Sequence, residues 1–500
     1  MKKEKILIVI IAFITLTLIN LPIFYFYVAK SDNLVFLGRR VINGEDTYTY
    51  VSFIEQSRQG RNLFENLYTT EEQKPLLLRP SYLFLGKLAA ILKLSSITTY
   101  HLARIVFSIF FFIVIYKFIC KFFNDTNTRL VAFFVICLSY GFGAINWIPE
   151  AFTFLSLAEA PHFILSQILM LLGFYFLIDF SLISPILFFL LSFEHPFNIL
   201  VVSSTIIFSF LWSRKGLLKA LIFVSLPLAG ILYQLFEIRN NPILASWQAQ
   251  NSTLSPSPND YLLGFGILIP LAIIGIEIFI KKNKFKYKLI LTWVIASIIM
   301  LYSPTNFQTR MIEGIHIPIS ILATSGIFVI YNRLKKHKNV FLFLILIILP
   351  IWSLTSIVKD FKIISANQSH YYSIDKDEFE AISWLGSNTN FDDIILSNKD
   401  YGNIIPGLIG RKTYLGHSIQ TTNLKFKIAN TNSFLLEQNE FTANSFVYFN
   451  KITYIFLGKD DFMLKYGFMP EKFHFLEKIY DKAGVLIYKV RQNDLFTNQK

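Results

Sequence analysis

The sequence predicts a polytopic α-helical membrane protein with about eleven transmembrane segments and a C-terminal extracytoplasmic domain of mixed α/β structure. The chain of 500 residues is 53% hydrophobic and 16% charged, with a mean hydropathy of +0.49. A soluble domain carries about 25% charged residues. Long apolar windows recur along residues 1–358, whereas residues 359–500 have a soluble composition. A soluble cytosolic enzyme, a disordered scaffold and a nucleic-acid binder are therefore excluded as first interpretations.

The amino-terminal segment predicts a retained first transmembrane helix. Residues 1–5 carry three lysines, and the apolar run that follows, 6–28, is too long for the hydrophobic core of a signal peptide. The basic start predicts a cytoplasmic amino terminus. In a membrane protein, the residues behind the formal net charge of +14 indicate which loops are cytoplasmic, because Lys and Arg are enriched in cytoplasmic loops.

The remaining apolar windows predict the other membrane segments. They fall at 101–119, 130–148, 162–180, 184–212, 219–238, 261–280, 287–303, 314–331 and 339–358. The window 184–212 is long for one helix, and it is interrupted by a polar pair before Pro196. If it is two short segments, the cytoplasmic loops hold 18 Lys and Arg and the short outer loops hold 2. The positive-inside bias favours this split, which gives eleven segments and an outer carboxyl-terminal domain. The Lys-, Asn-, Ile- and Phe-rich composition suggests an AT-rich prokaryote, which predicts the plasma membrane as the location.

Two regions are predicted to lie outside the membrane. The first outer loop spans 29–100, within a membrane domain of residues 1–358, and the C-terminal domain spans 359–500. In this domain the pattern predicts a helix at 377–388, strands at 392–397 and 452–458, and a hairpin over 477–490 that turns at 481–484. The Gly-rich segment 401–422 is predicted either to cap an active cleft or to have only a structural role.

The chain lacks the common nucleotide-binding and hydrolase motifs. It has no Walker lysine loop, no dinucleotide-binding glycine fingerprint after a strand, no zinc-protease helix and no nucleophile elbow. The two cysteines, Cys120 and Cys137, occupy positions that suggest neither a disulfide nor a metal site. An enzyme of this kind would take its donor from the membrane.

Two adjacent carboxylates follow the first predicted span, in the run GEDTYTY at 44–50. A carboxylate in a partly apolar cleft can act as a general base, so Asp46 and Glu45 are candidate catalytic residues. The alternative is a turn at Gly44 with a solvated acidic pair. On an extended loop, neighbouring side chains point in opposite directions, and only one of the two would face a cleft.

The other candidates lie in the predicted outer loops. Glu150, Glu159 and His162 could supply oxygen and nitrogen ligands to a divalent cation, although a His beside Pro161 is often structural. Arg310 could bind a phosphate bidentately, or form a helix-end ion pair with Glu313. Arg79, His195 and His316 complete the polar set. Ionisable groups at membrane depth are usually functional. The alternative is that these residues lie in solvent-exposed, acidic outer loops and have no specific function.

Taken in order, these motifs resemble the membrane glycosyltransferases of the C-type fold, which include protein mannosyltransferases, lipid A aminoarabinose transferases and oligosaccharyltransferases. The resemblance is to a prokaryotic branch of this group and covers about residues 1–358 and, more weakly, the C-terminal segment. It rests on the long first loop with its acidic pair and on the following runs: RPSYLFLGKLAAILKL, LSYGFGAINW, APHFILSQILMLLGF, FEHPF, WQAQNSTLSPSP and NFQTRMIEGIHIP.

The resemblance implies a glycosyltransferase that uses a polyprenyl-phosphate-linked sugar as donor and inverts the anomeric centre. Asp46 best matches the family's first-loop carboxylate, with Glu45 next, and Arg310 resembles its phosphate-binding arginine. Arg79, His195, His162 and Glu313 are further substrate-binding candidates. Glu150 and Glu159 match the second acidic motif only loosely, so a divalent cation is a candidate and no cofactor is certain. The acceptor would be a glycan, a lipid or a protein, and nucleic acid is not an expected partner.

Two other functions fit part of the pattern. A lipid-linked sugar flippase or other transporter would also be polytopic and bind phosphate, but it would more often show internal repeats or broken helices. A polysaccharide polymerase or ligase shares the lipid donor, but usually has its large catalytic loop late in the chain. The long loop here is early, which favours the transferase.

Overall fold

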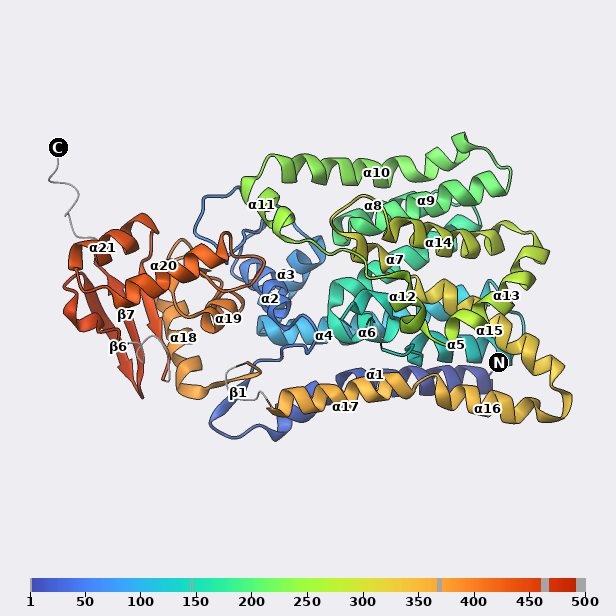
Figure 1. Cartoon of the computed structure of the whole chain (residues 1–500), viewed down its shortest axis with the longest axis horizontal. Coiled ribbons are helices and arrows are strands. Elements are labelled where there is room, and N and C mark those ends of the chain that lie inside the picture. Colours follow the sequence, from blue (N-terminus) through green and yellow to red (C-terminus); the bar gives the residue numbers. More distant parts are fainter. Residues whose placement is uncertain (1, 144, 146, 367–370, 460–466, 492–500) are drawn as a thin grey trace. The chain divides into compact units, whose positions relative to one another are not determined.

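The computed structural model describes residues 2–143, 145, 147–366, 371–459 and 467–491 (Figure 1). The chain divides into two compact units. The helical unit comprises residues 1–25, 101–238 and 251–363, and the mixed unit comprises 26–100, 239–250 and 364–500. The first outer loop therefore groups with the C-terminal segment, although a long membrane region separates the two in the sequence.

The helical unit is built from consecutive apolar helices, of which α1, α4, α10 and α17 include residues of the mixed unit. Their bounds are α1 (Lys2–Ala29), α4 (Ser96–Cys120), α5 (Thr126–Leu138), α6 (Thr153–Glu159), α7 (Pro161–Ile178), α8 (Ile183–Glu194), α9 (Phe197–Trp212), α10 (Leu217–Arg239), α12 (Pro258–Phe265), α13 (Leu268–Lys282), α14 (Phe285–Leu301), α15 (His316–Arg333), α16 (Lys338–Ile348) and α17 (Ile351–Ala366). Short 3₁₀ turns are η1 (Pro149–Ala151), η2 (Gln308–Ile312) and η3 (Lys335–His337).

Five helices of the described chain are long and apolar enough to cross a membrane, and α12 with α13 makes a sixth if that bent pair is one span. These helices are typical of a multi-pass membrane protein, and the count of eleven segments stays a prediction. Three predicted spans differ from continuous helices. In the window 339–358, α16 ends at Ile348 and α17 begins at Ile351. The window 261–280 bends by 86° between α12 and α13. In the window 130–148, helix α5 ends at Leu138, since Gly141 and Gly143 follow and glycine disfavours helix.

The predicted division of the window 184–212 is confirmed at the level of secondary structure. Helix α8 ends at Glu194 and α9 begins at Phe197, so the break lies at His195 and Pro196. Proline lacks the amide proton that a helix interior needs, and its ring disfavours helical geometry in the preceding residue. The break leaves His195 at the junction of two apolar helices.

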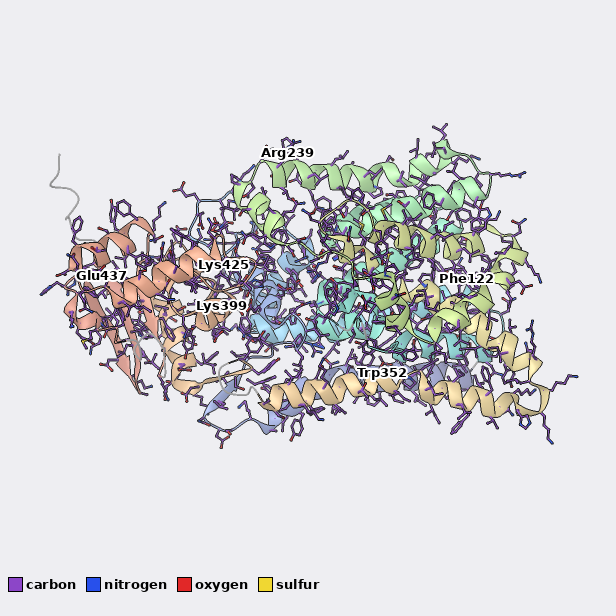
Figure 2. All side chains as sticks on the ribbon, in the orientation of Figure 1. Phe122, Arg239, Trp352, Lys399, Lys425 and Glu437 are labelled. Atoms are coloured by element: carbon purple, nitrogen blue, oxygen red, sulfur yellow. The ribbon has the colours of Figure 1, made fainter. Side chains whose placement is uncertain are left out.

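Apolar side chains lie on the outside of this unit, as expected for helices in contact with lipid. On α1, Val9 and Phe13 are 65% and 68% exposed. Helix α17 runs alongside α1 in Figure 1, and the rings of Tyr25 and Phe361 lie 5.2 Å apart between them. Trp352 of α17, labelled in Figure 2, also has an exposed ring. Exposed apolar surface of this extent indicates an apolar environment rather than water.

Inside the unit, α13 and α15 approach so closely that their contact requires glycine. A β-carbon at Gly275 would lie 1.9 Å from the carbonyl oxygen of Leu322, and one at Gly326 would lie 1.9 Å from that of Leu271. Small residues at such crossings let helix backbones approach each other, a common device in membrane proteins.

The mixed unit combines the first outer loop with the C-terminal domain. Its elements are β1 (Leu34–Phe36), α2 (Gly44–Arg58), α3 (Pro80–Leu92), α11 (Pro242–Gln250), β2 (Ser373–Asp375), α18 (Lys376–Asn388), β3 (Ile394–Leu396), α19 (Lys399–Ile409), β4 (Lys412–Thr413), α20 (Leu424–Leu436), α21 (Glu440–Phe449), β5 (Tyr454–Leu457), η4 (Pro470–Lys472), β6 (Leu476–Lys482) and β7 (Val485–Val490). The predicted helix at 377–388, both predicted strands and the hairpin are confirmed, and the hairpin turns at Ala483 and Gly484, where φ is positive.

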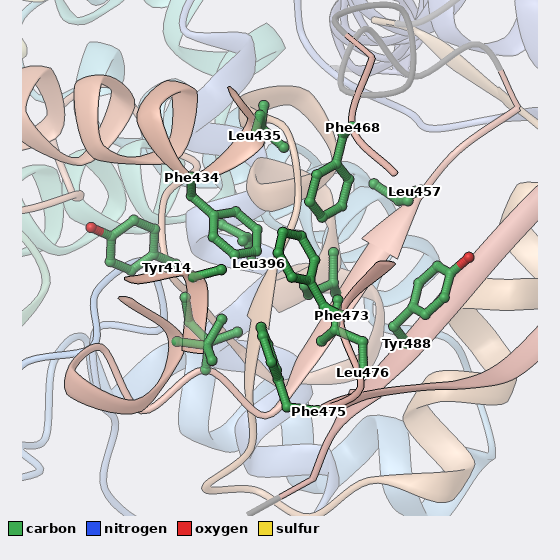
Figure 3. Close-up of a cluster of buried hydrophobic side chains, with 14 of the residues drawn as sticks. Leu396, Tyr414, Phe434, Leu435, Leu457, Phe468, Phe473, Phe475, Leu476 and Tyr488 are labelled. Carbon is green, nitrogen blue, oxygen red and sulfur yellow. The ribbon is translucent and has the colours of Figure 1, made fainter. Parts of the chain in front are cut away.

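A five-stranded mixed sheet organises the C-terminal part, in the order β4-β3-β5-β7-β6. Strand β3 pairs in parallel with β4 and β5, whereas β7 is antiparallel to β5 and β6. One face carries an aromatic core in which Phe434, Phe468 and Phe473 pack together (Figure 3). A second core joins Ile395, Ile405 and Phe456 of this domain to Tyr48 of α2.

Backbone pairing ties the first outer loop to the C-terminal segment. Strand β1 is antiparallel to β2, with Val35 opposite Ile374. The hydroxyl of Tyr48 donates to the carbonyl of Leu37 at 3.0 Å, and Gly407 of α19 lies against the ring of Tyr48. Helix α2 thus packs on α19, and this packing places the acidic pair beside the loop that follows β4.

Candidate active site around Asp46 and the buried polar clusters

The acidic pair lies in the first turn of a helix. Asn43 precedes α2 in the left-handed region (φ 49°), and Glu45 and Asp46 follow Gly44 at the start of the helix. Carboxylates are favoured there by the helix dipole. The expectation of an extended loop with diverging side chains was therefore wrong, because both side chains contact the same segment, residues 417–418.

Asp46 is paired with a histidine 371 positions away. Its Oδ1 lies 2.8 Å from Nε2 of His417, and the two side chains are 26% and 3% exposed respectively. The other ring nitrogen of His417, Nδ1, accepts from the backbone amides of Ile419 at 3.0 Å and Gln420 at 3.2 Å. The ring also makes an edge contact with Tyr68, with centroids 5.6 Å apart.

Glu45 binds the same segment through both of its oxygens. Oε1 accepts from Nζ of Lys399 at 2.8 Å, and Oε2 accepts from the amide of Ser418 at 2.8 Å. Burial by itself would raise the pKa of Glu45, but the hydrogen bonds from Lys399 and Ser418 outweigh it and hold the pKa below its ordinary value of 4.5. Lys399, labelled in Figure 2, is the first residue of α19.

Helix α19 presents this segment to α2. A β-carbon at Gly402 would lie 1.9 Å from the carbonyl oxygen of Leu415, so glycine allows the chain before His417 to lie directly on α19. Asn403, on the same helix, accepts from Nη2 of Arg39 at 2.5 Å. Its Nδ2 donates to the backbone oxygen of Glu45 at 3.4 Å. The segment 401–422 thus combines a helix, a short strand and the loop that contacts the acidic pair.

Two arginines precede the acidic pair and were missed by the sequence analysis. The guanidinium of Arg39 lies 4.3 Å from the ring centroid of Tyr371. Arg40 is 4% exposed, and its Nε has no hydrogen-bond partner within the described residues. Two adjacent arginines shortly before GEDTYTY were the signal in the sequence that could have identified them.

Arg79 caps the neighbouring helix α3 in an unusual conformation. Its φ is 50°, in the left-handed region that non-glycine residues seldom adopt. Its guanidinium lies 5.0 Å from the centroid of Tyr50 in α2, and Tyr50 stacks on Tyr82 of α3 at 5.6 Å. A strained residue beside an aromatic stack is a feature found at functional sites.

Arg411 and His417, which the sequence placed in one Gly-rich segment, have different environments. Nη1 of Arg411 donates to Gln59 Oε1 at 2.8 Å, and Nη2 donates to the carbonyls of Gly386 and Thr389 at 2.9 and 2.8 Å. These partners are structural groups of the mixed unit. Only His417 of the two contacts a candidate catalytic carboxylate.

In the helical unit, Arg310 of η2 forms an ion pair with Glu150 of η1. The alternative partner that the sequence suggested, Glu313, is engaged elsewhere, so that ion pair is not formed. Oε2 of Glu313 lies 2.9 Å from Nδ1 of His195 and accepts from Nδ2 of Asn198 at 2.6 Å. Ser166 of α7 donates to the other oxygen of Glu313.

These polar residues are buried, so the alternative of a wet, acidic outer surface was wrong for them. The buried set comprises Glu150, Glu159, His162, His195, Glu313 and His316. The ring of His162 lies 6.4 Å from that of His195. His316 contacts Ser139 at 3.1 Å and Thr153 at 3.0 Å through its two ring nitrogens. The segment 308–316 therefore bonds to α6, α7 and α9, to η1 and to the residue that follows α5.

The predicted cation ligands do not form a recognisable metal site. Glu150 is already neutralised by Arg310. Within the described ranges, no group of three or more His, Cys, Asp or Glu side chains is arranged to hold a metal ion. A divalent cation stays a prediction, and no chemical step is derived through one.

Comparisons with known proteins find similarity in structure only. No family model matches the sequence, and no curated protein matches it. The apo oligosaccharyltransferase of Archaeoglobus fulgidus is similar over 98% of this chain and 75% of that chain, with a TM-score of 0.54 and 14% identity. The structure of the same enzyme with an inhibitory peptide and a dolichol-phosphate is similar over 99% of this chain and 75% of that chain, with a TM-score of 0.52 and 14% identity.

A third structure of that oligosaccharyltransferase, in complex with Zn and sulfate, covers 98% of this chain and 74% of that chain, with a TM-score of 0.52 and 15% identity. Similarity at this level of identity establishes the fold. The fold that the sequence motifs suggested is thereby confirmed: the chain has the C-type fold of membrane glycosyltransferases.

Proposed function

We propose that this chain is an integral-membrane glycosyltransferase that moves a sugar from a polyprenyl-phosphate donor to an extracytoplasmic acceptor with inversion. The observation that carries the proposal is the Asp46 carboxylate, held at the start of α2 by His417 at 2.8 Å in a chain with the fold of an oligosaccharyltransferase. A carboxylate fixed by a buried partner is suited to accept a proton in a defined direction.

In the proposed reaction, Asp46 acts as the general base. A hydroxyl or amide of the acceptor attacks the anomeric carbon of the donor sugar and loses its proton to Asp46. The bond between the anomeric carbon and the phosphate oxygen breaks, and the lipid phosphate leaves with the bonding electron pair. A positioned base commonly contributes about 10²–10⁴-fold to such a step. Attack on the face opposite the leaving phosphate inverts the anomeric centre.

The structure supports different roles for Glu45 and Asp46. Both oxygens of Glu45 already accept hydrogen bonds from Lys399 and Ser418. We assign Glu45 to anchoring the 417–418 segment on α2, with a smaller effect on catalysis. Asp46 remains the catalytic candidate.

In the helical unit, we assign Arg310 to the donor phosphate. Its side chain is 23% exposed, and it is neutralised by a Glu150 side chain that is 1% exposed. A guanidinium stabilises the negative charge that develops on a leaving phosphate. Glu313, His195 and His162 are buried around the segment that carries Arg310, so we assign them to holding that segment. Arg79, which lies over Tyr50, is a further candidate for substrate contact.

A lipid-linked donor is supported by two observations of different kinds. The chain lacks the glycine-rich loops that hold nucleotides, and the oligosaccharyltransferase of the same fold has been solved with a dolichol-phosphate. The acceptor for this chain is a glycan, a lipid or a protein exposed on the outer side of the plasma membrane.

The proposal is tested with purified full-length protein in detergent or nanodiscs. A panel of polyprenyl-phosphate sugars and the matching nucleotide sugars are each incubated with a cell-envelope extract as acceptor, with Asp46→Asn as the inactive control. We expect consumption of at least one lipid-linked sugar by the wild type and none of the nucleotide sugars. Turnover of a nucleotide sugar without a lipid carrier would refute the donor class. Full activity of both Asp46→Asn and Glu45→Gln would refute the base mechanism, whereas consumption of no lipid-linked sugar by the wild type would favour a transporter.

A further inference from the structure

The two ring nitrogens of His417 have partners of opposite hydrogen-bonding character. Nδ1 faces the backbone amides of Ile419 and Gln420 at 3.0 and 3.2 Å. An amide N–H can only donate, so Nδ1 must present a lone pair. Nε2 faces Oδ1 of Asp46 at 2.8 Å, and an ionised carboxylate can only accept. The proton of a neutral ring therefore belongs on Nε2.

His417 is 3% exposed, so its ring has little access to water as an alternative partner. A carboxylate oxygen of Glu45, Oε2, also lies 4.0 Å from Nδ1.

We propose that His417 is a positioning residue for Asp46 and donates to its carboxylate through Nε2–H. The inference rests on the proposed function, because the orientation of Asp46 affects the reaction only if Asp46 is the general base. Fixing Oδ1 by one directed hydrogen bond restricts rotation of the carboxylate and so sets the direction of Oδ2. The C-terminal domain then contributes directly to the active site through one side chain.

A purely structural role for His417 is less well supported, because the same loop has other anchors. The amide of Ser418 donates to Glu45 at 2.8 Å, and the hydroxyl of Ser418 accepts from Lys399 at 2.7 Å. The backbone amide of Gly416 donates to Thr421 Oγ1 at 3.1 Å. The loop is thus held on both sides of His417 without the contact to Asp46.

Two substitutions test the roles of the two ring nitrogens of His417 separately. In His417→Gln, the side-chain amide nitrogen can occupy the place of Nε2 and donate to Asp46, while the acceptor for residues 419 and 420 is lost. In His417→Asn, the amide oxygen can occupy the place of Nδ1 and accept from those amides, while the donor to Asp46 is lost. Each variant is therefore the control for the other.

If His417 positions Asp46, His417→Gln keeps kcat within about tenfold of the wild type. His417→Asn then loses roughly 10–100-fold in kcat, the size expected when an orienting partner is removed, with KM for the lipid donor little changed. Equal kcat in His417→Asn and wild type, or a loss confined to His417→Gln, would overturn the inference. The melting temperature of each variant is measured alongside, to identify loss of folded protein.

A second experiment uses the wild-type protein and does not depend on enzymatic activity. Nitrogen NMR of ¹⁵N-histidine-labelled protein, with the His417 signal assigned by its absence from His417→Gln, reports which ring nitrogen carries the proton. We expect a protonated Nε2 in the folded wild type. An Nε2 without a proton would overturn the inference. If Asp46→Asn is fully active, the proposed base fails; if Asp46→Asn is inactive while His417→Asn is active, only this inference fails.

Discussion

Arg310 and Glu150, 160 positions apart in the sequence, are ion-pair partners in the helical unit. The sequence had suggested each of them for a different ligand, a phosphate for Arg310 and a cation for Glu150. Glu150 is 1% exposed, so the guanidinium is what compensates its buried charge. The pair joins η1, which follows α5, to η2, which precedes α15.

This pair predicts that single and double substitutions will differ in stability. Arg310→Met should destabilise the protein by about 3 kcal/mol or more, because it leaves a buried carboxylate without its partner. Adding Glu150→Gln removes that charge and should restore most of the lost stability, measured as the melting temperature in detergent. If Arg310 binds the donor phosphate, the restored double variant will still have a raised KM for donor. Recovery of both stability and KM would show that Arg310 is only structural.

The acidic pair predicts unequal effects on catalysis. Asp46→Asn keeps the shape of the side chain and removes the base, so turnover should fall roughly a thousandfold with donor binding little changed. Glu45→Gln should be milder, since its oxygens are occupied by Lys399 and Ser418. Single-turnover rates and donor affinity are measured for both variants. Loss of activity in Glu45→Gln with retention in Asp46→Asn would reverse the assignment.

Glu45 also predicts a pH-dependent contribution to stability. Its pKa in the folded chain lies below the ordinary 4.5, so folding favours the ionised form. This contribution is complete above the unfolded-state pKa and is lost as the pH falls through the folded-state value. The melting temperature of Glu45→Gln should therefore lie below that of the wild type at pH 7, and the gap should shrink below about pH 4.5. A gap that is constant from pH 7 to pH 3.5 would contradict this.

Arg411 provides a structural comparison for His417. Its guanidinium binds Gln59 and the carbonyls of Gly386 and Thr389, so Arg411→Ala should lower the melting temperature by leaving these groups without a donor. The activity per folded molecule should stay within a fewfold of the wild type. Activity is normalised to the monodisperse fraction in size-exclusion chromatography. A hundredfold loss in that fraction would place Arg411 in the active site.

The predicted orientation can be tested with the exposed residue Ser387 at the end of α18. With the native cysteines replaced, a cysteine substituted at Ser387 should react with a membrane-impermeant maleimide in intact cells. A chain that retains only Cys120, which is exposed and predicted to be cytoplasmic, is the matched control and should react only after permeabilisation. Protection of position 387 in intact cells would show that the C-terminal domain is cytoplasmic.

The sequence by itself determined the features that depend on local pattern. Apolar windows indicated the long helices, and the His195–Pro196 break followed from the geometry of proline. The hairpin over 477–490 followed from alternation around a Gly-containing turn. The order of short motifs was sufficient to suggest the fold that the structural comparison confirmed. Each of these features depends on interactions between residues that are close together in the sequence. The order of residues is therefore enough to predict them.

The tertiary structure alone decided which side chains are partners. Asp46 meets His417 across 371 positions, and Arg310 meets Glu150 rather than Glu313. No local signal contains these pairings, because they depend on how α2 packs on α19 and how η1 meets η2. The same packing buries residues that an outer-loop position had suggested were exposed. A charged group removed from water must find a compensating partner, and only the packing of distant elements decides which one is within reach.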